Sequence, residues 1–193
     1  MKIVICGGHL SPALSLLEVM PKHVEVIFIG RKYVFEKEKV LSLEYKVVKE
    51  KNIPFYPLTT GRFQRKFTLE TIPSLLKFPI GFFQSITILR KEKPNVVVGV
   101  GGYISLPVCL AALLLGIPVV IHEQTQEAGF ANKLISHFAR KVCISWESSR
   151  KFFPEKKIVL TGNPIRKEFR ITNSDKWAAD NLRNRRRDWI SFY

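Results

Sequence analysis

Three short segments place glycines or ionisable side chains directly after runs of apolar residues. They are Gly7-Gly8-His9 after residues 3–6, Gly101-Gly102-Tyr103-Ile104-Ser105 after residues 96–100, and His122-Glu123-Gln124 after residues 119–121. Glycines let a backbone approach a phosphate closely, and a helix that begins after such a turn offers unpaired N–H groups. Imidazole and carboxylate groups can transfer protons. The three segments therefore predict a site for a phosphate-bearing ligand with acid–base groups beside it.

The two glycine turns also have purely structural interpretations. Residues 7–9 can form a simple tight turn with an incidental histidine, and Tyr103 can be a half-buried packing residue rather than one that packs on a sugar ring. We expect Ser11 to be the N-cap of a helix with Pro12 in its first turn. Ser105 is expected either to cap the following helix or to donate a hydrogen bond to phosphate.

The third segment leaves a similar choice open. Buried ionisable groups need partners, so His122, Glu123 and Gln124 form either a ligand site or a structural hydrogen-bond network. Asn132 and Lys133, on the helix expected next, would help to hold this cluster.

The charge balance favours anionic partners. The chain of 193 residues has 31 Lys and Arg against 16 Asp and Glu, a net charge of +15. Such a field attracts phosphates, acidic lipid surfaces or nucleic acid, and by itself it does not choose among them.

The cysteines and the apolar stretches exclude several classes of protein. Cys6, Cys109 and Cys143 are far apart in apolar contexts with no metal-ligand spacing, which predicts reduced, buried side chains in a cytosolic protein. No signal peptide is visible. The longest apolar stretch, residues 106–121, is shorter than the roughly 20 residues that span a bilayer and contains two prolines. We therefore expect no membrane-spanning helix.

Strand and helix patterns alternate along the chain, which predicts an α/β, Rossmann-like parallel sheet with helices on both faces. The expected strands are residues 2–6, 24–30, 46–50, 55–57, 95–100, 119–123, 141–145 and 157–161. The expected helices are residues 11–20, 68–90 with interruptions at Pro73 and Pro79, 106–115 and 129–138. The carboxyl ends of parallel strands share one edge, which brings the three polar segments together.

Two further regions have a distinctive composition. A segment rich in phenylalanine and basic residues is explained by core packing or by a patch that sits on anionic lipid head groups; the residues concerned are Phe63, Phe67, Phe78, Phe82 and Phe83. The domain is expected to span residues 1–170. Residues 171–193 form a basic, arginine-rich tail, interpreted as a solvated helix or as an arm that binds nucleic acid or lipid.

Five motifs, in order and over about residues 1–170, resemble the N-terminal acceptor half of MurG-type glycosyltransferases. They are Gly-Gly-His-Leu-Ser-Pro-Ala at 7–13, Gly-Gly-Tyr-Ile-Ser-Leu-Pro at 101–107, Gly-Ile-Pro-Val-Val-Ile-His-Glu-Gln at 116–124, Ala-Asn-Lys at 131–133 and Gly-Asn-Pro-Ile-Arg at 162–166. The resemblance implies the first of the two Rossmann-like domains of a GT-B enzyme. It also implies transfer of N-acetylglucosamine from UDP-N-acetylglucosamine to a lipid-linked muramyl-pentapeptide in peptidoglycan synthesis, with inversion and with no redox cofactor or metal.

The resemblance also assigns roles to residues. It implies that the glycine turns, with Tyr103 and Ser105, hold the acceptor diphosphate, and that His9 deprotonates the muramyl C4 hydroxyl. His122 and Glu123 would orient the acceptor or share the proton transfer, and the sequence leaves His9 and Glu123 open as the base. Further substrate contacts would come from Gln124, Asn132 and Arg166. The phenylalanine-rich segment coincides with the membrane patch of the family.

Three departures from the family pattern are visible. The first glycine loop is shorter than usual, Thr125 stands where the family has asparagine, and no donor-binding domain follows residue 166. We therefore expect an acceptor half at the cytoplasmic face of the membrane, whose partners are the lipid-linked acceptor, the UDP-sugar, an anionic membrane surface and a separate donor domain. The alternative is a non-catalytic acceptor-binding subunit of a split transferase. A nucleic-acid-binding protein is a distant third.

Overall fold

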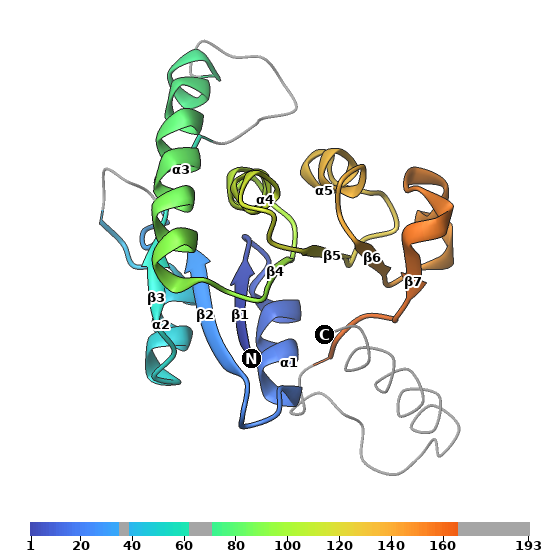
Figure 1. Ribbon diagram of the computed structural model, residues 1–193, viewed down its shortest axis with the longest axis horizontal. Coiled ribbons are helices and arrows are strands. Elements are labelled where there is room, and N and C mark those ends of the chain that lie inside the picture. The colour runs from blue at the N-terminus through green and yellow to red at the C-terminus, as the bar shows by residue number, and fades with distance from the viewer. Residues whose placement is uncertain (35–38, 62–70, 166–193) are drawn as a thin grey trace.

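The computed structural model describes residues 1–34, 39–61 and 71–165 of the chain. A single sheet of seven parallel strands in the order β3-β2-β1-β4-β5-β6-β7 runs through the described part (Figure 1). The strands are β1 (Lys2–Cys6), β2 (Glu25–Gly30), β3 (Phe55–Pro57), β4 (Val96–Gly99), β5 (Val119–Glu123), β6 (Lys141–Ile144) and β7 (Ile158–Leu160). The predicted α/β Rossmann-like class is confirmed.

Helices cover both faces of this sheet (Figure 1). The helices α1 (Leu10–Val19) and α2 (Leu43–Glu50) pack on one face, and α3 (Thr71–Glu92), α4 (Ser105–Leu114) and α5 (Phe130–Ser136) pack on the other. Two short 3₁₀ helices, η1 (Glu147–Phe152) and η2 (Glu155–Lys157), connect β6 to β7. Because both faces are covered, the central strands are continuous apolar runs.

The two faces of the sheet bury alternate residues of each strand. Along β1, Val4 and Cys6 belong to the core under α3, α4 and α5, whereas Ile3 and Ile5 belong to the core under α1 and α2. This period of two is the side-chain alternation of any β-strand. Cys6, Cys109 and Cys143 are all unpaired and buried in these cores, as predicted.

Two expectations about secondary structure were wrong. Residues 46–50, predicted as a strand, belong to α2, because Ser42 begins a helix there and its hydroxyl accepts a hydrogen bond from the amide of Tyr45 at 3.1 Å. The helix α3 also continues through Pro79 instead of stopping. In both places tertiary packing outweighs the local sequence pattern. Val48 of α2 packs into the core, and α3 packs against α4.

Strand order fixes where a ligand can enter. The chain builds β1, β2 and β3 outward in one direction and then returns to place β4 on the other side of β1. In such sheets the crevice lies outside the carboxyl ends of the two strands at this switch point. Here these are the ends of β1 and β4, where both glycine turns begin.

Within the described ranges, no helix is long and apolar enough to cross a bilayer. Phe63, Phe67, Arg166 and residues 171–193 lie outside the described residues.

Candidate functional site

The two glycine turns form one interlocked unit. The amide of Gly8 donates to the carbonyl of Gly101 at 3.0 Å, and the Ser105 hydroxyl donates to the same carbonyl at 2.9 Å. Gly7 has φ of +142°, and a Cβ there would lie 2.6 Å from the Gly101 oxygen. Only glycine fits this close approach of two backbones.

These contacts remove two hydrogen-bond donors from the expected diphosphate site. The Gly8 amide donates to Gly101, and the Ser105 hydroxyl lies within hydrogen-bond distance of the carbonyls of Gly101 and Cys6, so neither is aimed at a ligand. Ser105 does not cap α4 either, because the N-cap is Ile104, and the N-cap of α1 is His9 rather than Ser11. Neither N-cap side chain makes a capping hydrogen bond to its own helix. In the first turn of α1, at the switch point, Leu10 and Ser11 have backbone N–H groups and Pro12 has none.

His9 has a defined tautomer. Its side chain is exposed, and its Nδ1 lies 3.0 Å from the carbonyl oxygen of Val100. A carbonyl only accepts hydrogen bonds, so Nδ1 carries the hydrogen of the neutral ring and Nε2 holds a lone pair. The contact therefore orients a proton acceptor at the crevice.

His122 lies in a contrasting environment. It is 1% exposed, and its Nε2 lies 3.2 Å from the Ser145 hydroxyl and 3.4 Å from the Gly162 carbonyl. Burial lowers the pKa of His122 to about 4, so the ring is neutral at physiological pH. His122 therefore joins the ends of β5, β6 and β7 from inside the protein, and the structure does not present it to a ligand.

Glu123 is also buried, at 2% exposed, and is completely hydrogen-bonded. Its Oε1 accepts from the amide of Thr125 at 3.0 Å and from the Thr125 hydroxyl at 2.6 Å. Its Oε2 accepts from the amide of Gly129 at 3.0 Å and from Nδ2 of Asn132 at 3.0 Å. The carboxylate thus organises the loop between β5 and α5, and Thr125, the departure from the family pattern, is one of its partners.

Asn132 connects this loop to the glycine turns. It is 2% exposed, and its Nδ2 also donates to the carbonyl of His122 at 3.1 Å. A Cβ on Gly101 would lie 3.3 Å from Nδ2 of Asn132 and 3.2 Å from Nδ1 of His9. His9 and Asn132 therefore both lie beside Gly101, so residues at the ends of β1, β4 and β5 lie close together.

The remaining predicted residues lie around this centre. Tyr103 is half-buried and packs against the core, as its structural interpretation predicted. Gln124 is half-buried, and its carbonyl accepts from the indole Nε1 of Trp146 at 3.1 Å. The Ser149 hydroxyl donates to the carbonyls of Thr125 at 2.8 Å and Gln126 at 3.2 Å.

Sequence analysis missed Ser145, Trp146 and Ser149, which brace the site from the β6 side. The available signal was position, because Ser145 and Trp146 directly follow a buried strand at the same edge of the sheet as His122.

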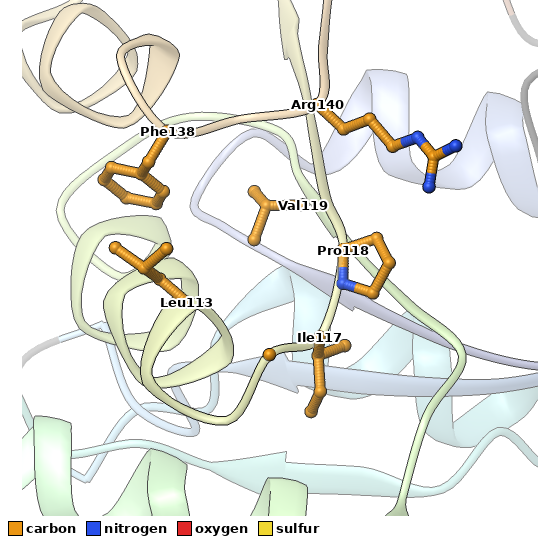
Figure 2. A pocket seen from close by; sticks show the side chains of 7 residues that line it. Leu113, Ile117, Pro118, Val119, Phe138 and Arg140 are labelled. Atoms are coloured by element: carbon orange, nitrogen blue, oxygen red, sulfur yellow. The ribbon is translucent and has the colours of Figure 1, made fainter.

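Figure 2 shows a pocket at the opposite end of β5. It has a volume of about 220 Å³ and is mostly apolar; its lining residues are Leu113, Gly116, Ile117, Pro118, Val119, Phe138 and Arg140. Val119 begins β5, whereas His122 and Glu123 end it, so this pocket is separate from the polar site. In the part of the chain that the structure describes, no group of three or more His, Cys, Asp or Glu side chains could hold a metal ion.

Comparison with known proteins identifies the family of the chain. Residues 6–144 match the glycosyltransferase family 28 N-terminal domain. The chain is 41% identical over 175 residues to a UDP-N-acetylglucosamine--N-acetylmuramyl-(pentapeptide) pyrophosphoryl-undecaprenol N-acetylglucosamine transferase of Myxococcus xanthus, covering 87% of this chain and 44% of that protein. The protein of the same name from Bacillus subtilis is 38% identical, covering 82% of this chain and 42% of that protein.

Solved structures show the same similarity. The crystal structure of Acinetobacter baumannii MurG matches with a TM-score of 0.65 and 29% identity, covering 82% of this chain and 44% of that one. A UDP-GlcNAc 2-epimerase from Neisseria meningitidis matches with a TM-score of 0.57 at 18% identity, covering 85% of this chain and 47% of that one, which shows a shared fold alone. The chain spans less than half the length of the Myxococcus and Bacillus transferases.

Proposed function

Because the chain belongs to the family of the glycosyltransferase family 28 N-terminal domain, we propose that it is the acceptor half of an N-acetylglucosaminyltransferase. The reaction moves N-acetylglucosamine from UDP-N-acetylglucosamine to the C4 hydroxyl of a lipid-linked muramyl-pentapeptide. The observation that carries the proposal is the exposed, oriented imidazole of His9 at the switch point, beside the α1 N-terminus.

His9 is the proposed general base. Its Nε2 takes the proton of the C4 hydroxyl while that oxygen forms a bond to the anomeric carbon of the donor sugar. The bond from this carbon to the UDP oxygen breaks, and UDP leaves with the electron pair, which inverts the anomeric centre. The Val100 carbonyl then stabilises the imidazolium, because Nδ1–H already donates to it.

The acceptor diphosphate is proposed to bind at the first turn of α1. A helix N-terminus presents backbone N–H groups and a partial positive charge to an anion. The interlocked turns hold this helix end against β4 through Gly8 and Gly101. Glu123 then acts as a positioning group rather than as the base, because all four of its hydrogen bonds are made inside the protein.

The proposed contact with an anionic membrane surface lies on α3. Phe78 and Phe82, predicted as patch residues, pack instead against the core, whereas Phe83 is 64% exposed. Ile80, 50% exposed, lies about one turn before Phe83, and Leu76, 70% exposed, lies about two turns before it, on the same side of the helix. We define Leu76, Ile80 and Phe83 as the α3 apolar face. Arg90 and Lys91, both exposed further along α3, add positive charge.

The test is transfer of radiolabelled N-acetylglucosamine from its UDP donor to a short-chain lipid acceptor. The full chain is assayed alone and with the donor domain of a relative supplied as a separate polypeptide, and acceptor binding is measured by calorimetry. Transfer in the mixture supports the proposal, and transfer by the chain alone would show that donor binding also lies within these 193 residues. Acceptor binding without transfer in either sample would support the alternative, a non-catalytic binding subunit. Absence of acceptor binding would refute both.

A further inference from the structure

Trp146 presents an aromatic ring at the carboxyl edge of the sheet. It directly follows Ser145 at the end of β6 and is 45% exposed. Its indole Nε1 donates to the carbonyl of Gln124 at 3.1 Å. An indole has one N–H donor and no acceptor, so this bond uses the only polar group of the side chain. The part of Trp146 that faces solvent is therefore apolar ring.

The surroundings of Trp146 hold the ring in place. The Ser145 hydroxyl lies 3.2 Å from Nε2 of buried His122, and the Ser149 hydroxyl donates to the carbonyl of Thr125 at 2.8 Å. Both sides of Trp146 are thus tied to the end of β5 and its loop. Fixing an aromatic side chain before a ligand arrives reduces the entropy that binding must overcome.

The residues between Trp146 and the proposed base lie close to one another. His9 and Asn132 both lie beside Gly101, and Asn132 donates to the carbonyl of His122. The His122 ring contacts Ser145, the neighbour of Trp146. The strands β1 and β6 are three positions apart in the sheet, so about 14 Å separates their ends. A ligand that extends about 14 Å from the glycine turns along this edge would span the distance to the end of β6, which Trp146 follows.

We propose that Trp146 is a stacking residue for the ring of an N-acetylhexosamine in the bound substrates. The C–H groups on one face of a pyranose form an apolar surface that fits a fixed aromatic ring, while its polar rim needs hydrogen-bonding groups nearby. The exposed side-chain amide of Gln126 lies in the loop that the indole contacts through the Gln124 carbonyl, and it is such a group. This inference rests on the proposed function, because it takes the substrates to be amino-sugar compounds.

Two substrates of the proposed reaction carry such a ring, and the experiment separates them. The chain has three tryptophans, Trp146, Trp177 and Trp189. In the full chain with Trp177→Phe and Trp189→Phe, the fluorescence comes from Trp146 alone. This protein is titrated separately with the short-chain lipid acceptor and with UDP-N-acetylglucosamine. UDP and inorganic diphosphate are the controls that lack the N-acetylhexosamine ring.

The expected result is a saturable change in Trp146 emission with one of the two sugar ligands and none with the controls. The midpoint should equal the Kd that calorimetry gives for the same ligand. Trp146→Ala should weaken that affinity by about tenfold, whereas Trp146→Phe, which keeps an aromatic face, should stay within about threefold.

Calorimetric binding of the sugar ligands without an emission change would overturn the inference and leave the proposed function standing. Unchanged affinity in Trp146→Ala would overturn it as well, even with an emission change, because the ring would then only sense the loop. If Trp146→Ala does not fold, the change in Trp146 emission in the Trp177→Phe, Trp189→Phe protein decides whether the inference holds. Failure of the unsubstituted chain to bind the acceptor would instead refute the proposed function itself, and with it this inference.

Discussion

The imidazole of His9 and the carboxylate of Glu123 lie on the same edge of the sheet in opposite environments. His9 is exposed and has one ring nitrogen fixed by the Val100 carbonyl. Glu123 is 2% exposed, and both of its oxygens accept two hydrogen bonds from the protein. A group that takes a proton from a ligand must reach it, which favours His9.

We expect His9→Gln to lower the transfer rate of the chain mixed with a donor domain by about 10²- to 10⁴-fold, because glutamine cannot accept the proton. The side chain is exposed, so the unfolding free energy should stay nearly unchanged. The matched control is His137→Gln, which removes another exposed histidine whose Nδ1 contacts a backbone carbonyl. A rate within about threefold of wild type in His9→Gln would rule out His9 as the base.

Glu123→Gln is expected to lower the free energy of unfolding by about 1–3 kcal/mol, because an amide cannot accept from all four donors. Urea denaturation at neutral pH measures this loss. The control is Glu127→Gln, an exposed side chain in the same loop, which should change stability by less than about 0.5 kcal/mol. Equal stabilities of the two variants would contradict the positioning role assigned to Glu123.

Among the elements, the turn between β1 and α1 and the turn between β4 and α4 depend on each other. Gly8 donates to Gly101, and the Ser105 hydroxyl lies 3.2 Å from the carbonyl of Cys6, so each turn helps to hold the other. The structure also accounts for helix starts without side-chain caps at α1 and α4, since the strands that precede them are locked in the sheet. Tertiary packing thus replaces the capping that isolated helices need.

Gly7→Ala and Gly8→Ala form a matched pair that tests this interlock. A Cβ at Gly7 would lie 2.6 Å from the Gly101 oxygen, whereas a Cβ at Gly8 has no neighbour within 4 Å. We expect Gly7→Ala to cost about 1–3 kcal/mol of unfolding free energy. Gly8→Ala should cost much less. Chemical denaturation measures the unfolding free energy of both variants. Similar losses of stability would show that the close approach of Gly7 to Gly101 is not required for the fold.

On the scale of the whole molecule, a large positive net charge occurs together with an exposed apolar surface on α3. The net charge of +15 attracts anionic surfaces over a range set by the ionic strength. The α3 apolar face adds three large side chains that are at least half exposed. We propose that weak electrostatic attraction and shallow insertion together give a reversible contact with a membrane surface.

Replacing the α3 apolar face with Leu76→Ser, Ile80→Ser and Phe83→Ser should reduce binding to vesicles of anionic phospholipid by about tenfold or more. The matched control is Leu113→Ser with Leu114→Ser on α4, which removes exposed leucines from another helix. Vesicle sedimentation at two salt concentrations measures both variants. Equal losses in the two would show that general surface hydrophobicity, rather than the α3 apolar face, drives binding.

The sequence by itself determined the sheet and the edge that carries the site. Strands such as β5 were placed correctly because a strand that is buried on both faces is a nearly continuous run of apolar residues. The polar groups that directly follow these runs had to share one edge, since parallel strands end together. The contrast between exposed His9 and buried Glu123, the mutual dependence of the glycine turns and the fixed position of Trp146 were decided only by tertiary structure. Each depends on contacts between residues far apart in the chain, and burial and hydrogen-bond partners at that range leave no local pattern.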